Sequence, residues 1–198
     1  EFAIEQGAHK PLFKVHFHDE KHGHVLGAYG MILVTRDGGQ NWEHVLHHME
    51  NDSFYHLFDF AQLPGDGRFF LSGEAGLFMV GDINAEEGRV IDSVPWEGSF
   101  FTSEAAPSGA IVMGGLRGRM FRTEDEGSNW TTVEKPPSSS IVASTTLANG
   151  ALVFAGIGGE LLISTDDGVT FNYLPLRTGS RIYAVEEGPP GTLLVGGP

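Results

Sequence analysis

The sequence predicts an all-β fold, a β-propeller of four-stranded antiparallel blades, and three observations predict it. An eight-residue motif recurs along the chain, pairs of glycines recur before it, and short apolar runs alternate with turn residues. The glycine pairs begin at Gly27, Gly73, Gly115 and Gly156, at steps of 46, 42 and 41 residues. A period of this length that holds four short strands is typical of a propeller blade.

Each expected unit repeats the same elements in the same order. An apolar first strand is followed by a turn, a second strand, the glycine pair, a third strand, the eight-residue motif and a fourth strand. The expected first strands are residues 12–17, 53–60, 99–102, 140–143 and 181–185. The second strands read GHVLG, RFFLSG, AIVMGG, ALVFAG and TLLVGG. Alternating or continuous apolar runs bounded by glycine and proline favour strands over helices.

These landmarks divide the chain into four complete units and a partial fifth within one propeller domain or propeller fragment. The expected units are residues 12–52, 53–98, 99–139, 140–179 and 180–198. Counting back eleven residues from Phe13 reaches Phe2, so we expect residues 1–11 to supply the closing strand of a preceding blade. The four complete units and the two incomplete ends are expected to form part of a larger ring.

The recurring motif, which we call the Asp-box, follows the pattern Ser/Thr-x-Asp-x-Gly-x-Asn/Thr-aromatic. It reads TRDGGQNW, TEDEGSNW and STDDGVTF, and it has decayed to VGDINAEEG in the second unit. In a hairpin loop the Asp should accept bonds from backbone N–H groups one to three residues on, and the Gly should take a left-handed angle. The aromatic should pack between sheets. The assigned residues are Asp37, Gly39, Trp42, Asp125, Gly127, Trp130, Asp166, Gly168 and Phe171.

Composition excludes several classes of function. The formal net charge of −14 disfavours binding to nucleic acid or to anionic membranes, which both need a basic face. The absence of cysteine excludes disulfides and thiol chemistry, and no apolar run approaches the ~20 residues of a membrane-spanning helix. The chain begins at Glu1 without a methionine, so the missing signal peptide gives no information on export.

The glycine pairs do not indicate a nucleotide cofactor. The stretches GAYGMI, GEAGLF and GLRGRM are not followed by a helix, which a phosphate-binding glycine motif requires. We expect these glycines to form tight turns between strands. No cofactor is therefore expected.

The histidines offer a weak metal candidate. All nine lie within residues 9–56, and His16, His18, His22 and His24 form the run HFHDEKHGH. On a strand His16 and His18 share one face, so they could hold zinc with a third ligand from His22, His24 or Asp19. The spacing matches no standard zinc motif, and the alternative is a polar outer face and a turn.

Three arginines close together are the best candidate for a partner contact. Arg117, Arg119 and Arg122 lie within six residues of an otherwise acidic sequence. One interpretation is local pairing with Glu124, Asp125 or Glu126. The other is a patch that binds a partner bearing carboxylates.

A sialidase-like glycoside hydrolase or a carbohydrate-binding propeller is the alternative function. A sialidase needs three arginines converging on a carboxylate, a Tyr nucleophile activated by a Glu, and an Asp acid. Most of the arginines lie in loops or beside Asp-boxes rather than at the starts of inner strands. Tyr55 and Tyr183 are expected in innermost strands, where Tyr183 with Glu186 or Glu187 is the conceivable pair.

The Asp-boxes resemble the BNR repeats of sialidase-like propellers. Most of the chain more closely resembles the photosystem II stability/assembly factor family, in the stretches HGHVLGAYGMILVTRDGGQNWEHV, HLFDF with LSGEAGLF, and WEGSFFTSEAAPSGAIVMGGLRGRMFRTEDEGSNW. The last stretch resembles the bacterial branch. The decayed second Asp-box departs from the family pattern, and so does the lack of the family's N-terminal blades.

The resemblance implies a seven-bladed, exported propeller with no assigned enzymatic activity. Plant and cyanobacterial members of that family help to assemble photosystem II on the lumenal side, and bacterial members are often associated with resistance-nodulation-division exporters. The resemblance therefore implies a periplasmic or otherwise extracytoplasmic protein. We expect a non-enzymatic assembly or stability factor that binds a protein partner, such as a membrane complex or a transporter.

Overall fold

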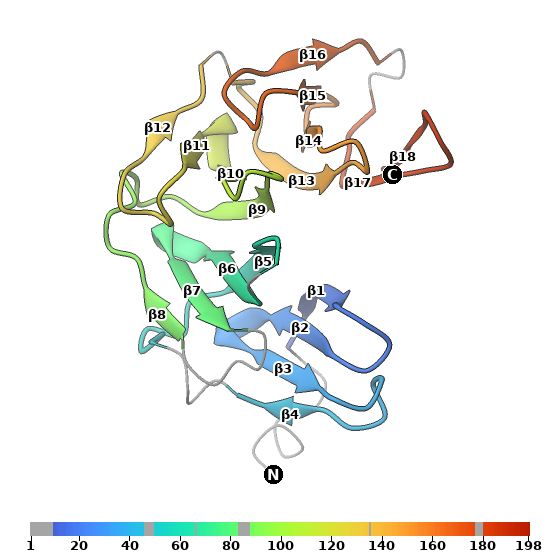
Figure 1. The fold of residues 1–198 in the computed structure, drawn as a ribbon. Coiled ribbons are helices and arrows are strands. Elements are labelled where there is room, and N and C mark those ends of the chain that lie inside the picture. Colours follow the sequence, from blue (N-terminus) through green and yellow to red (C-terminus); the bar gives the residue numbers. More distant parts are fainter. Residues whose placement is uncertain (1–9, 46–49, 66, 83–87, 135, 177–179) are drawn as a thin grey trace.

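The computed structural model describes residues 10–45, 50–65, 67–82, 88–134, 136–176 and 180–198. They form five antiparallel sheets, four with four strands and one with two, arranged as propeller blades along an arc (Figure 1). Helical structure among these residues is limited to short 3-10 turns such as η1 (Ala28–Gly30), η3 (Glu74–Gly76) and η4 (Leu116–Gly118). The all-β propeller prediction is confirmed. None of the described helical turns has the length or the apolar composition needed to cross a membrane.

Each four-stranded sheet follows chain order, and we number the sheets as blades 1 to 5. Blade 1 contains β1 (Leu12–Phe17), β2 (Gly23–Gly27), β3 (Ile32–Thr35) and β4 (Glu43–His44). Blade 2 contains β5 (Leu57–Gln62), β6 (Arg68–Gly73), β7 (Phe78–Asp82) and β8 (Gly88–Val90). Blade 3 contains β9 (Phe100–Ala105), β10 (Ile111–Gly115), β11 (Met120–Thr123) and β12 (Thr131–Thr132). Blade 4 contains β13 (Ile141–Thr146), β14 (Leu152–Gly156), β15 (Leu161–Ser164) and β16 (Asn172–Leu174), and blade 5 contains β17 (Ala184–Glu187) and β18 (Leu193–Gly196).

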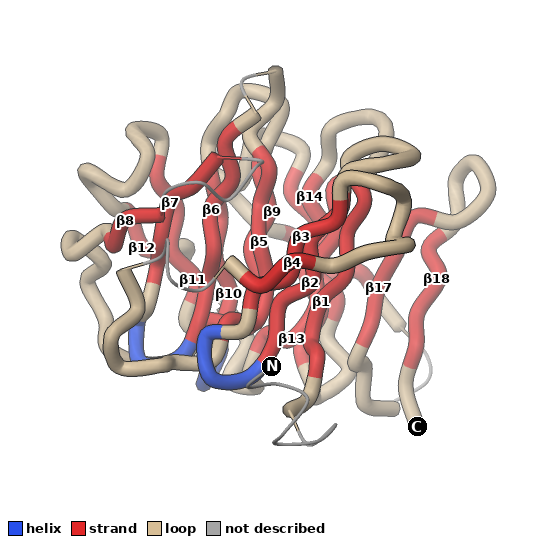
Figure 2. Tube along the Cα trace, turned by 90° about the horizontal axis from the view of Figure 1, so that it is seen from below, coloured by secondary structure: helices blue, strands red, loops and turns tan. Residues whose placement is uncertain are grey.

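The first strand of every blade lies on the concave side of the arc. Figure 1 shows β1, β5, β9, β13 and β17 innermost and the short fourth strands outermost. Neighbouring inner strands contact one another from β1 through to β17. In Figure 2 the strands stand side by side and the 3-10 turns lie together at one edge of the sheets.

Four hydrophobic clusters fill the spaces between successive blades. Phe60 and Leu71 of blade 2 pack with Leu26 of blade 1, and Phe100 of blade 3 packs with the blade 2 cluster. The two further clusters join blade 3 to blade 4 and blade 4 to blade 5. The second strands β2, β10 and β14 are buried along their whole length, and in blades 3 and 4 a neighbouring blade covers each face of the strand. This explains why their sequences read as continuous rather than alternating apolar runs.

Blade 2 differs from the expected pattern at its first strand. Its inner strand begins at Leu57, four residues after the expected start at Ser53. The Asn51 side chain binds both the N–H and the C=O of Tyr55, and Phe54 is left-handed, so these residues form a turn. The placement of Tyr55 in an inner strand was therefore wrong.

Two expectations fall mainly on residues outside the described part of the chain. The decayed Asp-box of blade 2 includes residues 83–87, after which β8 begins at Gly88. The closing strand expected within residues 1–11 falls largely on residues 1–9. The unit boundaries and the number of blades in the expected larger ring stay predictions.

The second glycine of each pair is required by a left-handed turn. In the β10–β11 turn, Arg117 and Gly118 have φ values of 57° and 72°. A Cβ atom on Gly118 would overlap the carbonyl oxygen of Pro137 in the segment that leads to blade 4. Gly191 in the β17–β18 hairpin also has positive φ, at 82°, but no atom lies within 4 Å of the position of a Cβ.

Gly118 and Gly191 both have positive φ, but only Gly118 is crowded, so substitutions at the two positions separate the energetic cost of the backbone angle from that of a steric clash. Replacing Gly191 by Ala should lower the free energy of unfolding by about 1 kcal/mol, because only the angle is strained. Replacing Gly118 by Ala should cost about 3 kcal/mol or more, because the backbone of the next segment must also move. Urea unfolding of both variants measures the difference, and equal losses would contradict the role of the Pro137 contact.

Candidate functional site

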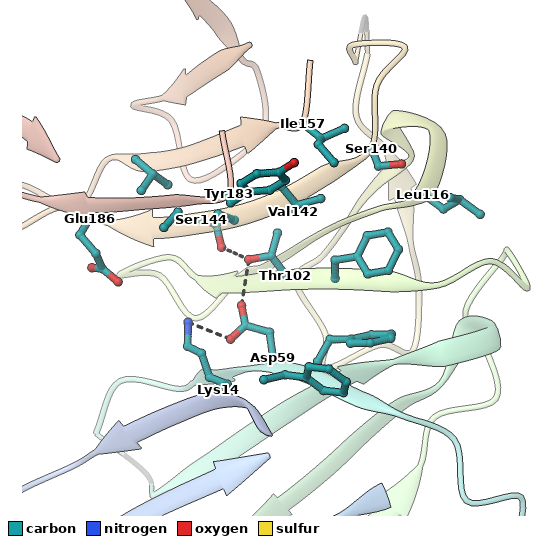
Figure 3. Close-up of a pocket in the computed structure, with 16 residues that line it drawn as sticks. Lys14, Asp59, Thr102, Leu116, Ser140, Val142, Ser144, Ile157, Tyr183 and Glu186 are labelled. Carbon is teal, nitrogen blue, oxygen red and sulfur yellow. Dashed lines mark hydrogen bonds and ion pairs between the residues drawn. The ribbon is translucent and has the colours of Figure 1, made fainter. Parts of the chain in front are cut away.

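A cleft of about 550 Å³ lies on the concave side of the arc and is lined by all five inner strands. We call it the axial cleft, and Figure 3 shows it in close-up. Its wall toward the 3-10 turns is apolar and its floor is polar. The apolar wall contains Phe13, Phe58, Phe101, Leu116, Val142, Ile157 and Tyr183. The polar lining includes Lys14, Asp59, Thr102, Ser144 and Glu186.

A break in strand register places one apolar residue per blade in this wall. Pairing with the second strand skips Phe13 in β1, Phe58 in β5, Phe101 in β9 and Val142 in β13. Tyr183 stands directly before β17, and its N–H donates to the carbonyl oxygen of Gly196. Such a bulge leaves a residue without a cross-strand partner and re-aims its side chain. The five residues form what we call the apolar arc.

Three phenylalanines of the apolar arc pack against one another across blades. The ring centroids of Phe13 and Phe58 are 5.2 Å apart, and those of Phe58 and Phe101 are also 5.2 Å apart. The rings are tilted by 49° and 63°, so they present edges as well as faces to the cleft. Phe13 is 40% exposed and Tyr183 is 48% exposed. Large apolar side chains left this exposed in a contiguous group are typical of an interaction surface.

The floor of the cleft is organised by the buried carboxylate of Asp59. Its Oδ1 atom lies 3.0 Å from the Lys14 ammonium and accepts the N–H of Phe60 at 2.9 Å. Its Oδ2 atom accepts the hydroxyl of Thr102 at 2.8 Å and the N–H of Ser103 at 3.2 Å. Four bonds from three blades therefore satisfy both oxygens, which is what a buried charge requires.

The network continues from Thr102 into blade 4. The Ser144 hydroxyl lies against that of Thr102 and donates to Glu104 at 3.0 Å. The other oxygen of Glu104 accepts the hydroxyl of Thr146 at 2.6 Å. Burial raises the pKa of Glu104 to about 7, against the hydrogen bonds that favour its charged form. Glu104 therefore keeps its proton to a higher pH than an exposed glutamate does.

The charge in the axial cleft is negative overall. Burial opposes the charge on Lys14, but the carboxylates of Asp59, Glu104 and Glu186 outweigh that effect and raise its pKa. Lys14 is the one cation among the described lining residues, and it is paired with Asp59. Glu186 lines the cleft as an exposed side chain, held by a long bond of 3.4 Å from Thr145. The uncompensated charge at the cleft surface is thus that of Glu186.

The three intact Asp-boxes share one hydrogen-bond pattern, shown here for blade 3. The Thr123 hydroxyl accepts the N–H of Gly127 at 2.8 Å and donates to Asp125 Oδ1 at 2.9 Å. Asp125 then accepts the backbone and side-chain N–H groups of Asn129, both at 2.7 Å. These bonds from Asn129 lower the pKa of Asp125. The bonded N–H therefore lies four residues after the Asp, beyond the expected Asx-turn spacing.

The boxes of blades 1 and 4 repeat this arrangement. Asp37 binds Asn41 as Asp125 binds Asn129, and Asp166 binds Thr170 through its backbone N–H and hydroxyl. The recurrence of Asn or Thr at the seventh box position thus has a direct cause. The hydrogen bonds of the Asp-box hold the loop between the third and fourth strands of a blade. A role of the Asp-box residues beyond this one stays outside what the geometry shows.

Each box of blades 3 and 4 is also tied to the preceding blade. Arg68 of blade 2 contacts Glu126 at 2.5 Å, and Ser93 donates to the carbonyl oxygen of Gly127. Arg122 of blade 3 donates to the carbonyl oxygen of Asp167, in the Asp-box of blade 4, at 2.7 Å. The boxes therefore join neighbouring blades at the outer edge of the arc.

The aromatic residues of the Asp-boxes in blades 3 and 4 also pack against the preceding blade. Trp130 packs on Phe78 of blade 2 with ring centroids 5.1 Å apart, and Phe171 packs against the cluster between blades 3 and 4. Trp42 instead packs on Phe17 of its own blade and is 37% exposed. The other described blades all lie beyond the opposite face of blade 1 (Figure 1).

The three candidate arginines have different surroundings. Arg122 is only 8% exposed, and besides its bond to Asp167 it donates to Glu124 at 2.6 Å, so it links blades. Arg117 and Arg119 are exposed beside the β10–β11 turn. A partner-binding role stays a prediction for Arg117 and Arg119, and the buried position of Arg122 favours the local-pairing interpretation for that residue.

Three of the four candidate histidines pack against blade 2. His16 packs edge-to-face on Phe60 with ring centroids 4.8 Å apart, and His18 is hydrogen-bonded to Gln62 at 2.8 Å and to His24 at 2.6 Å. His22 lies in the β1–β2 turn and binds Asp19 at 2.8 Å. Burial, with the charges of His18 and Lys14, lowers the pKa of His16. Within the described part of the chain, no group of three or more His, Cys, Asp or Glu side chains could hold a metal ion.

Sequence reasoning missed the axial cleft. The signal was the second residue of each inner run, which is bulky and apolar in LFK, LFD, FFT, IVA and IYA. A regular strand would turn this residue and its neighbours to opposite faces, so its position in the cleft depends on the bulge. Tyr183 and Glu186, considered as an enzymatic pair, both line the cleft.

Comparison with family models gives one match. The model for the photosynthesis system II assembly factor YCF48 matches residues 3–181. No curated protein matches the chain.

Comparison with solved structures supports the same fold. YCF48 bound to a D1 peptide is 23% identical with a TM-score of 0.70, and the match covers 94% of this chain and 60% of that one. YCF48 from Cyanidioschyzon merolae is 20% identical with a TM-score of 0.64, covering 90% and 60%. The chain thus spans about 60% of the length of these two structures. A GH74 xyloglucanase from Xanthomonas campestris is 15% identical with a TM-score of 0.72, covering 93% and 33%.

The Asp-box of blade 3 should contribute measurably to stability through Thr123. Replacing Thr123 by Val keeps the shape but leaves the Gly127 N–H without its acceptor, which should cost about 1–3 kcal/mol in the free energy of unfolding. Replacing the exposed Thr132 by Val is the control and should change it by less than about 0.5 kcal/mol. Equal effects in urea unfolding would show that the box bond does not stabilise the blade.

The ionisation of Glu104 should make stability fall as pH rises. Its pKa is about 7 in the folded chain against an ordinary 4.5, so the folded chain retains a proton that the unfolded chain has lost. The free energy of unfolding should decline between about pH 4.5 and 7, by up to about 3 kcal/mol. Glu104→Gln should remove this decline, whereas Gln in place of the exposed Glu134 should keep it. Unfolding curves that stay pH-dependent in Glu104→Gln would assign the decline to other groups.

Proposed function

The chain belongs to the family of the photosynthesis system II assembly factor YCF48, and on that premise we propose that it is a non-enzymatic assembly or stability factor for a membrane complex. Its partner would be a protein subunit of that complex. The relative solved with a D1 peptide supports a protein partner, since that structure holds YCF48 on a peptide. We propose an extracytoplasmic location on the family resemblance alone.

The observation that carries this proposal is the exposed apolar arc of the axial cleft. Five blades each direct a bulky side chain into one wall, and Phe13 and Tyr183 are exposed there by 40% and 48%. Aromatic side chains are enriched where proteins bind other proteins, because they bury a large area at small entropic cost. The same wall would be an unfavourable surface to leave in water without a partner.

The chemistry of the cleft floor argues against the glycoside hydrolase. A glycosidase needs two carboxyl groups free to act as acid and as base or nucleophile. Both oxygens of Asp59 are occupied by Lys14, Thr102 and backbone N–H groups, so Asp59 is committed to holding the blades together. A sialidase needs an arginine cluster, and none of the described residues lining the cleft is an arginine.

The proposal predicts a defect in the membrane complex when the gene is deleted. The full-length protein, tagged and purified from detergent-solubilised membranes of its host, should co-purify with subunits of one complex. Deletion should lower the amount of that assembled complex severalfold on native gels. Wild type and Tyr173→Ser should restore it, because Tyr173 is exposed on the outer strand β16, away from the cleft.

Two results would contradict the proposed function. One is an unchanged amount of every membrane complex in the deletion strain, together with no co-purifying subunit. The other is turnover of xyloglucan or of a sialoside by the purified protein, lost on replacing Glu186. That second result would establish the hydrolase instead.

A further inference from the structure

The axial cleft combines two features that together define the chemistry of a ligand. One wall is the apolar arc, and the polar lining of the same cleft includes the exposed carboxylate of Glu186. Figure 3 shows Tyr183 and Glu186 entering the cleft from the same strand region, across from Lys14 and Asp59. We propose that the axial cleft binds an extended peptide segment that carries one Lys or Arg flanked by bulky apolar side chains. The proposal rests on the proposed function and names the class of partner segment.

Charge complementarity selects a cation. Asp59 and Lys14 form an ion pair at 3.0 Å and largely cancel, which leaves Glu186 as the uncompensated group at the surface of the cleft. The whole chain carries a formal net charge of −14, so its field also attracts cations and repels acidic segments. A guanidinium or ammonium reaching Glu186 would form a charge-assisted hydrogen bond with its carboxylate.

Shape and polarity favour apolar side chains over a sugar. Carbohydrates stack on flat aromatic faces, whereas the rings of Phe13, Phe58 and Phe101 are tilted to one another by 49° and 63° and form no single flat platform. The hydroxyl of Thr102 donates to Asp59 and that of Ser144 donates to Glu104. They are therefore already engaged within the protein. A volume of about 550 Å³ is within the range that holds a few side chains.

The chain offers matched controls for both features. Tyr183 and Tyr173 are exposed by 48% and 52%, but Tyr173 lies on the outer strand β16. Glu186 and Glu187 are adjacent on β17, but Glu187 is not among the residues that line the cleft and its carboxylate accepts the N–H of Ala148 at 2.7 Å. Substituting the two members of a pair in the same way removes the same chemical group, once from the cleft and once from another surface.

The test measures binding of fluorescein-labelled peptides to the 198-residue chain by fluorescence anisotropy. The probes are GGLXFGG with Arg, Lys, Gln or Glu at position X, and GGSRSGG, which lacks the apolar flanks. The Arg and Lys peptides should bind, and the Glu peptide and GGSRSGG should each bind at least tenfold more weakly. Tyr183→Ser and Glu186→Gln should each weaken binding of the Arg peptide about three- to tenfold. Tyr173→Ser and Glu187→Gln should leave its binding unchanged. Urea unfolding of each variant checks that it is folded.

Several outcomes would overturn the proposal. They are tighter binding of the Glu peptide, no binding of any probe, equal effects of cleft and control variants, or displacement of the Arg peptide by a xyloglucan oligosaccharide. If the peptides fail while the membrane complex still co-purifies and depends on the gene, the cleft inference is wrong and the assembly function stands. If both fail, the assembly function is wrong as well.

Discussion

The structure depends on packing each sheet against a neighbouring blade. A four-stranded sheet of this size cannot bury its own middle strands, so β10 and β14 are buried because a neighbouring blade lies against each of their faces. The apolar clusters accordingly lie between blades, as where Phe100 of blade 3 joins the cluster of blade 2. A blade is thus a folding unit only together with its neighbour, which is the general property of stacked repeats.

Hydrogen bonds and ion pairs also join neighbouring blades, at the outer edge of the arc and at its inner edge. At the outer edge, Arg68 and Arg122 each reach from one blade to the Asp-box of the next. At the inner edge, Asp59 gathers Lys14, Thr102 and Ser103 from the blades on either side of its own. Buried charges of this kind cost desolvation energy and specify geometry more than they add stability. Fixing the blades at both edges sets how far apart the inner strands stand, and hence the width of the axial cleft.

The sequence was sufficient for the fold because its signals are local and repeated. The Asp-box, the glycine pair and the apolar runs each act within a hairpin, so their spacing alone predicted four-stranded blades. What could not be predicted depends on neighbours or on side chains acting at a distance. Tyr55 leaves the strand because Asn51 captures its backbone, and Arg122 turns inward because the carbonyl of Asp167 is within reach. Nothing in the residue types near these positions specifies those partners.

The axial cleft was missed for a related reason. Strand alternation assigns Phe13, Phe58 and Phe101 to the buried space between blades, and only a bulge beside the glycine pair turns them to the concave side. Glycines Gly27, Gly73 and Gly115 permit this because each faces the break with no side chain of its own. A bulge repeated in successive blades at one height is costly to retain for packing alone, since it leaves aromatic surface in water. The repetition is better explained if the apolar arc meets a partner, with the bulge converting a core position into a contact in each blade.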